Sequence, residues 1–161
     1  MIARDGVGSL SLRRIATDLG VSHTAFRRHF GDREGVLNAL AVQGHLRLAE
    51  ALAGAAAHGA FIDVGVAYVR FALAHPGHFT VMFRSDLLDN DDPELVAARA
   101  AAFAPLSAGV AQLGVDDREA GEVTGWAVVH GIATLALTGN LRGDPVALTR
   151  RALALTYPRN R

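Results

Sequence analysis

A chain of 161 residues, half of them hydrophobic, can form one large domain or a small domain joined to a larger one. The absence of cysteine excludes disulfide bonds and thiolate metal sites. The formal net charge is zero, no unbroken apolar run approaches the roughly 20 residues of a membrane helix, and the first residues lack a signal-peptide pattern. We therefore expect a soluble cytoplasmic protein with no membrane partner.

Basic residues are concentrated at the N-terminal end. Up to residue 33, six arginines outnumber three acidic residues, whereas the rest of the chain carries ten arginines and thirteen acidic residues. Every basic residue is arginine, since the chain has no lysine. Clustered positive charge beside a neutral or acidic body is the pattern of a DNA-contacting head.

Apolar residues recur at spacings of three and four, and strand-like alternation is never sustained, so an all-α fold is predicted. Near the N-terminus, Ser9 or Ser11 can cap a short helix that Gly20 ends. Ser22 can cap a second helix, which ends at the turn Gly31-Asp32.

A larger helical part is expected to follow. A long helix should run from about residue 33 to Ala57, and proline should separate the next two helices. An acidic loop is expected at 86–93. The helices expected after residue 60 are Phe61–Ala74, His78–Leu88, Glu94–Leu113 (interrupted or kinked near Pro105), Asp116–Leu141 and Asp144–Thr156.

The first two short helices, separated by a turn that contains glycine, are typical of a helix-turn-helix. We expect one small core to bury Ile15, Ala16, Leu19, Val21, Phe26 and Phe30. Packing of that face would turn the polar residues of the second helix outward, and this is the helix that enters the major groove. The candidate DNA-binding residues are Ser11, Arg13, Arg14, Ser22, His23, Thr24, Arg27, Arg28, His29 and Arg33.

A less specific interpretation remains open for this segment. Short amphipathic helix pairs are common, and arginines on their outer face are often only solvated. Under that interpretation, the chain is a helical interaction module, or a truncated regulator, without DNA binding.

The N-terminal segment resembles the TetR/AcrR family of transcriptional regulators. The matching positions are Ile15-Ala16, Gly20-Val21-Ser22, Arg28-His29-Phe30, Asp32-Arg33-Glu34 and Leu37. The resemblance implies a three-helix DNA-binding head over residues 1–45. Two positions depart from the family pattern: Arg27 replaces a usual tyrosine, and Ala25 replaces a frequent threonine.

The first helix of this head is represented only by its last turn, Met1 to Asp5. In the family, that helix covers apolar faces of the next two helices and adds phosphate contacts. We therefore expect the natural protein to begin upstream of Met1, or the present form to bind DNA weakly.

The body resembles the C-terminal domain of family members known for a Trp-His-Gly motif. The resemblance rests on His75-Pro76-Gly77 through Arg84 and on Gly125-Trp126 through His130-Gly131. It implies an effector-binding and dimerisation domain over residues 46–157, followed by a tail at 158–161. Candidate ligand-binding residues are Tyr68, Phe71, Phe79, Met82, Phe83, Phe103, Trp126 and His130. In an alternative interpretation, Trp126 and His130 are core residues, and the histidine donates a hydrogen bond to a backbone carbonyl.

The expected partners are double-stranded operator DNA, a small-molecule effector of unknown identity and a second copy of the chain. The last two helices, about Asp117–Leu141 and Asp144–Thr156, carry small residues that permit close packing in a homodimer. A symmetric dimer fits a palindromic operator, and the resemblance implies a ligand-responsive repressor.

An enzyme is not expected. His75 and His78 have a metal-ligand spacing, and several aspartates follow them, but the pair straddles a helix junction. The chain shows no phosphate-binding glycine loop and no nucleophile elbow. We therefore predict no catalytic residue, no metal site and no cofactor.

Overall fold

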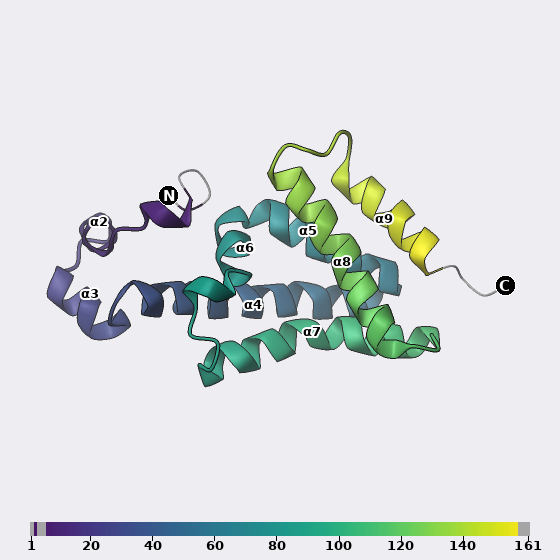
Figure 1. The fold of residues 1–161 in the computed structure, drawn as a ribbon, viewed down its shortest axis with the longest axis horizontal. Coiled ribbons are helices and arrows are strands. Elements are labelled where there is room, and N and C mark those ends of the chain that lie inside the picture. Colours follow the sequence, from purple (N-terminus) through teal and green to yellow (C-terminus); the bar gives the residue numbers. More distant parts are fainter. Residues whose placement is uncertain (1, 3–5, 158–161) are drawn as a thin grey trace. The chain divides into compact units, whose positions relative to one another are not determined.

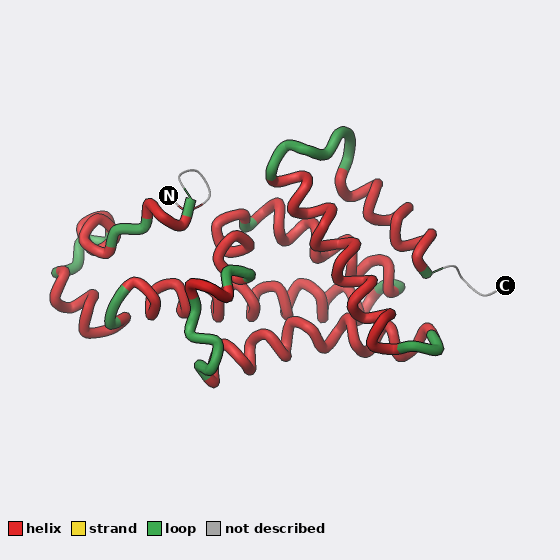
Figure 2. The backbone as a smooth tube through the Cα atoms, in the orientation of Figure 1, coloured by secondary structure: helices red, strands yellow, loops and turns green. Residues whose placement is uncertain are grey.

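The structure, a computed structural model, describes Ile2 and residues 6–157. Helices and turns make up this part of the chain, and no strand occurs in it (Figure 2). The prediction of an all-α fold is confirmed. The expected tail 158–161 and most of the expected helical remnant Met1–Asp5 lie outside the described residues.

The helices begin and end close to the predicted positions. Polar side chains start several of them: Ser11, Ser22, Asp117 and Asp144 each accept a hydrogen bond from a backbone N–H in the first turn of the helix that follows. In chain order the elements are η1 Val7–Ser9, α2 Leu12–Asp18, α3 His23–Phe30, α4 Arg33–His58, α5 Phe61–Ala74, α6 Pro76–Met82, η2 Ser85–Leu87, α7 Pro93–Leu113, α8 Arg118–Leu137 and α9 Pro145–Thr156 (Figure 1).

Two predicted segments differ from the structure. The helix expected over His78–Leu88 begins two residues earlier, because proline is tolerated at the first helical position, where its missing N–H would have no partner. That helix, α6, ends at Met82, and the short η2 follows. The interruption expected near Pro105 is absent, since α7 runs from Pro93 to Leu113 with Pro105 inside it, and the alternative of a kink there stays a prediction.

The chain forms two compact units that are not contiguous in sequence. Unit 1 comprises Met1–His45 and Pro76–Arg99, and unit 2 comprises Leu46–His75 and Ala100–Arg161. The boundary expected at 45/46 coincides with one boundary of the units, but the segment 76–99 packs with the N-terminal part. The assignment of DNA binding to 1–45 and of effector binding to 46–157 stays a prediction.

Unit 1 has a core that connects the short N-terminal helices to α4, α6 and α7. Leu37 and Ala41 of α4 are fully enclosed in it, as is Leu95 of α7. The buried Asn38 side chain donates to the Asp92 carboxylate at 3.0 Å and accepts from the Asp89 backbone N–H at 3.0 Å. These two bonds fasten the loop before α7 to the first turns of α4.

Unit 2 is centred on three helices that all contact one another, namely α5, α8 and α9 (Figure 1). Val69 of α5 and Ala133 of α8 are completely buried, and Leu153 of α9 is almost so. Gly65 permits the close approach of α5, because a Cβ there would overlap a methyl group of Leu153 and lie 3.1 Å from Val129.

Candidate functional site

Helices α2 and α3 contact each other and are joined by a tight turn in unit 1. Gly20 adopts a φ of 69°, which glycine reaches without steric cost, and the Val21 N–H returns to the Ala16 carbonyl at 3.0 Å. Ser22 then caps α3 by accepting a hydrogen bond from the Ala25 N–H at 3.1 Å. The geometry is that of a helix-turn-helix.

The outer surface of α3 is polar and basic. Its one buried residue is Phe26, which packs on Phe30 with ring centroids 4.8 Å apart. The predicted contact residues of this helix are all exposed: His23, Thr24, Arg27, Arg28 and His29. No acidic residue occurs in α3, so its arginines face solvent without an internal counter-charge on the same helix.

The core beneath this surface is smaller than predicted. Ala16 and Phe26 are buried as expected, and Ile15 and Phe30 are half-buried. Leu19 and Val21, however, are 64% and 45% exposed. Leu19 stands at the C-cap of α2, one residue beyond the helix, and Val21 lies in the turn, so neither continues the apolar face toward Phe26.

The predicted phosphate contacts around α3 have different local roles. Ser11, Arg13 and Arg14 are exposed, and Ser11 also caps α2 at 3.4 Å from the Arg14 N–H. Arg33 is half-buried and donates through Nη2 to the Val7 carbonyl at 2.9 Å. Arg33 therefore fixes η1 against the start of α4, whereas Arg13 and Arg14 are accessible.

In unit 2, the structure brings together three of the predicted ligand-binding residues. The Tyr68 hydroxyl lies 2.9 Å from His130 Nδ1, and Trp126 Nε1 donates to the same hydroxyl at 3.4 Å. The Tyr68 hydroxyl is therefore a side-chain partner of the histidine. Burial lowers the pKa of His130 and raises that of Tyr68, so both groups are held neutral at pH 7.

The other predicted ligand-binding residues are divided between the two units, with Phe71 and Phe103 in unit 2. Phe103, in unit 2, is 39% exposed. Phe79, Met82 and Phe83 belong to unit 1, where Met82 is 1% exposed and packs beside Gly44 of α4. A ligand-binding role for these residues stays a prediction.

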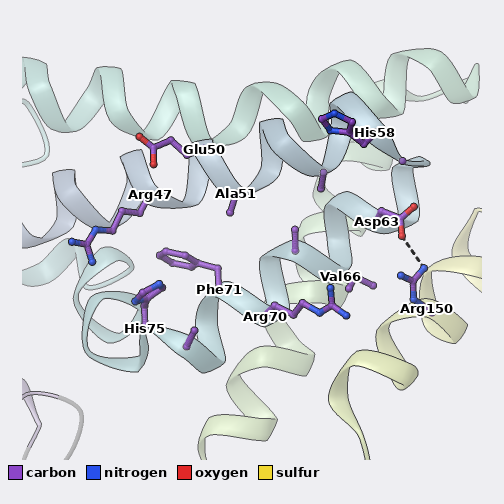
Figure 3. A pocket seen from close by; sticks show the side chains of 14 residues that line it. Arg47, Glu50, Ala51, His58, Asp63, Val66, Arg70, Phe71, His75 and Arg150 are labelled. Carbon is purple, nitrogen blue, oxygen red and sulfur yellow. Dashed lines mark ion pairs between the residues drawn. The ribbon is translucent and has the colours of Figure 1, made fainter.

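A groove of about 990 Å³ in unit 2 was not predicted from the sequence, apart from Phe71. The C-terminal part of α4 and the length of α5 form its walls (Figure 3). The spacing of Arg47 and Glu50 on α4, and of Asp63 and Arg70 on α5, could have indicated a charged face on each helix, but not that the two faces line one groove. Its lining is Arg47, Glu50, Ala51, Ala55, His58, Gly59, Asp63, Val66, Ala67, Arg70, Phe71, Ala74, His75 and Arg150.

Metal and membrane sites have little support in the structure. Among the described residues, no group of three or more His, Asp or Glu side chains is placed to share a metal ion. Helices α7 and α8 are long and apolar enough to cross a membrane, with a mean hydropathy of 1.2. Core helices of water-soluble proteins meet the same criterion, and α8 packs on α5 and α9, so this is weak evidence for a membrane span.

Comparison with known families gives two matches. Residues 1–40 match the model of bacterial regulatory proteins of the tetR family, and residues 61–156 match that of the tetracyclin repressor-like C-terminal domain. The chain is 30% identical over 142 residues to an uncharacterised HTH-type transcriptional regulator, Rv0681, of Mycobacterium tuberculosis. The match includes 84% of this chain and 65% of that relative, so the chain spans less than two thirds of its length.

Solved structures share the fold over nearly the whole chain. A protein of unknown function from Rhodococcus sp. RHA1 is 35% identical, with a TM-score of 0.81 over 97% of this chain and 87% of that one. The TetR family transcriptional regulator PfmR from Thermus thermophilus has a TM-score of 0.70 at 19% identity, over 97% of this chain and 92% of that one. At that identity, the second likeness concerns the fold alone.

Proposed function

Because the chain belongs to the tetR family of bacterial regulatory proteins, we propose that it is a transcriptional regulator that binds operator DNA through α3. The observation that supports this proposal is the exposed basic surface of α3, a helix in which Phe26 is the single buried residue. An α-helix with its side chains is about 10–12 Å wide, close to the roughly 12 Å width of the major groove.

The residues of α3 divide into two chemical classes. His23 and Thr24, at the start of the helix, offer small donors and acceptors to base edges, and Arg27 and Arg28 can each take a guanine edge or a phosphate. Ser11, Arg13, Arg14, Ser22 and His29 lie on the same two helices or at their caps and would contact the backbone. Phosphate contacts set affinity and register, and base contacts set the sequence choice.

We further propose that the protein acts as a homodimer through α8 and α9. The support is an apolar surface on these helices in the single chain: Val123 is 56% exposed, Leu135 is 45% exposed and Leu155 is 84% exposed. Large exposed apolar side chains on two contacting helices are candidates for an interaction surface. A second copy would cover them symmetrically, and a symmetric dimer would match a palindromic operator.

Repression relieved by a small molecule is the regulatory mode that we propose. The Tyr68–His130–Trp126 cluster and the groove between α4 and α5 are two places in the described part of unit 2 where polar groups meet apolar side chains. Since operator DNA is the proposed partner, we place the protein in the cytoplasm. We assign no catalytic role to any residue.

DNA binding can be tested by selecting duplexes from a random pool with the purified protein. We expect enrichment of an inverted repeat, and we expect its affinity to fall steeply as salt rises, because each phosphate contact releases counterions. If no sequence is enriched and salt does not weaken the binding of the protein to DNA, the result would support the alternative that the chain is a helical interaction module without DNA binding.

A further inference from the structure

We propose that the groove between α4 and α5 binds a small amphipathic monocarboxylate, with the carboxylate beside Arg70 and the hydrophobic part along Val66 and Phe71. The inference names the chemical class of the effector, and it therefore rests on the ligand-responsive function proposed above. It places the effector outside the Tyr68–His130–Trp126 cluster.

One end of the groove holds three charged groups with an excess of one positive charge. The Asp63 carboxylate forms an ion pair with Arg150 of α9 at 2.8 Å through Oδ1, and it accepts the Ala60 N–H at 3.0 Å through Oδ2. Hydrogen bonds from Arg150 and Ala60 lower the pKa of Asp63, and Arg70 lowers it further. Both oxygens of Asp63 are therefore engaged, and the carboxylate stays ionised.

Arg70 is the positively charged residue of this group that does not pair with Asp63. Its side chain is exposed on the groove wall, and within the described residues no carboxylate lies within 4.0 Å of its guanidinium. Figure 3 shows the Arg70 side chain extending along the groove on the side of Arg150. A guanidinium in this position can hold a carboxylate through two parallel N–H···O bonds.

The remainder of the groove is suited to an apolar body. Val66 and Phe71 are buried residues that still line it, and four alanines line it as well: Ala51, Ala55, Ala67 and Ala74. The Phe71 ring lies 5.0 Å from the His75 ring, which gives an aromatic wall at the other end. A hydrocarbon chain extending from Arg70 would pass over this surface.

The charge of the lining favours a monoanion over a phosphate. Three arginines, Arg47, Arg70 and Arg150, face two carboxylates, Glu50 and Asp63, so one negative charge from a ligand balances the groove. A dianion would exceed that balance, and Glu50 and Asp63 would repel its second charge.

The test is calorimetric titration of the purified protein with decanoate, decan-1-ol and inorganic phosphate. We expect decanoate to bind at least about tenfold more tightly than either of the others, because decan-1-ol lacks the charge for a bidentate pair with Arg70 and inorganic phosphate lacks the hydrocarbon chain. Arg70→Gln should weaken decanoate binding by at least about tenfold, while Arg142→Gln, at an exposed arginine in the loop between α8 and α9 and outside the groove, should leave it unchanged.

Decanoate binding that survives Arg70→Gln, or equal binding of decanoate and decan-1-ol, would overturn the inference. Both variants change exposed side chains, and circular dichroism checks that they remain folded. Duplex binding is measured on the same preparations: a protein that binds its selected duplex but not decanoate contradicts this inference alone. A protein that binds decanoate through Arg70 but binds no duplex contradicts the proposed function instead.

Discussion

His45, in the middle of α4, is a buried titratable residue of unit 1 whose pKa is strongly shifted. Its side chain is 5% exposed and packs edge-on against Phe83, with ring centroids 5.7 Å apart. Neither ring nitrogen has a hydrogen-bond partner among the described residues. Burial lowers the pKa of His45 to about 4. The Met82 backbone raises this pKa and the charge of Arg99 lowers it, each by less than burial does.

This pKa predicts a loss of stability on mild acidification. Unfolded His45 titrates near 6.5 and folded His45 near 4, so the unfolded state binds the proton first as the pH falls. The free energy of unfolding should be unaffected above pH 6.5 and should fall between about pH 6.5 and 4 by as much as about 3 kcal/mol. His130, whose pKa is also lowered by burial, adds to the loss.

Urea denaturation at several pH values measures this slope. His45→Leu should remove most of it, while the same substitution at the exposed His58 should leave it unchanged. A His45→Leu protein that loses as much stability on acidification as the unaltered protein would show that burial of His45 does not govern the slope.

At the scale of elements, the close packing of α5 against α8 and α9 predicts that two glycine-to-alanine substitutions change the stability in opposite directions. Gly65→Ala should destabilise the protein by about 1–3 kcal/mol, because the new methyl group would overlap Leu153, which is 1% exposed and has no space to move into. Gly54→Ala, on the exposed side of α4 with no atom near its added Cβ, should instead stabilise by about 0.5–1 kcal/mol. Thermal unfolding of the two variants compares them directly; equal effects would contradict this account of α5 packing.

The elements also show which features the sequence could predict. Local signals set the cap at Ser22 and the turn at Gly20, and both were predicted because each depends on neighbours along the chain. The start of α6 at Pro76 was missed because proline was interpreted only as a helix breaker.

Long-range partners were harder to predict. The spacing of Trp126 and His130 indicates a shared face, but it cannot show that Tyr68, far away in sequence, supplies the hydroxyl that both contact. For the same reason, the sequence did not reveal that Arg150 of α9 reaches Asp63 in the groove. Leu19 and Val21 had the right spacing for a core, yet they are exposed because helix α2 ends before them.

At the scale of the whole molecule, the proposed dimer predicts a change of oligomeric state. Replacing Leu135 and Leu155 together by Glu should convert a dimer into a monomer, because two desolvated charges would have to enter an apolar interface. Val96→Glu changes an exposed side chain of α7, outside α8 and α9, and should leave the dimer intact. Analytical ultracentrifugation gives the mass of each variant; a double variant that remains dimeric would place the interface elsewhere.

The central claim is that α3 binds DNA through its exposed basic surface, and the most direct test is the salt dependence of duplex affinity in an arginine series. Fluorescence anisotropy with the selected duplex should show a loss of at least about tenfold for Arg27→Ala and for Arg28→Ala, and a shallower salt slope by about one for each arginine that contacts a phosphate. Arg142→Ala, exposed in the loop between α8 and α9, should bind as the unaltered protein does. Unchanged affinity and slope when both α3 arginines are replaced would contradict the account.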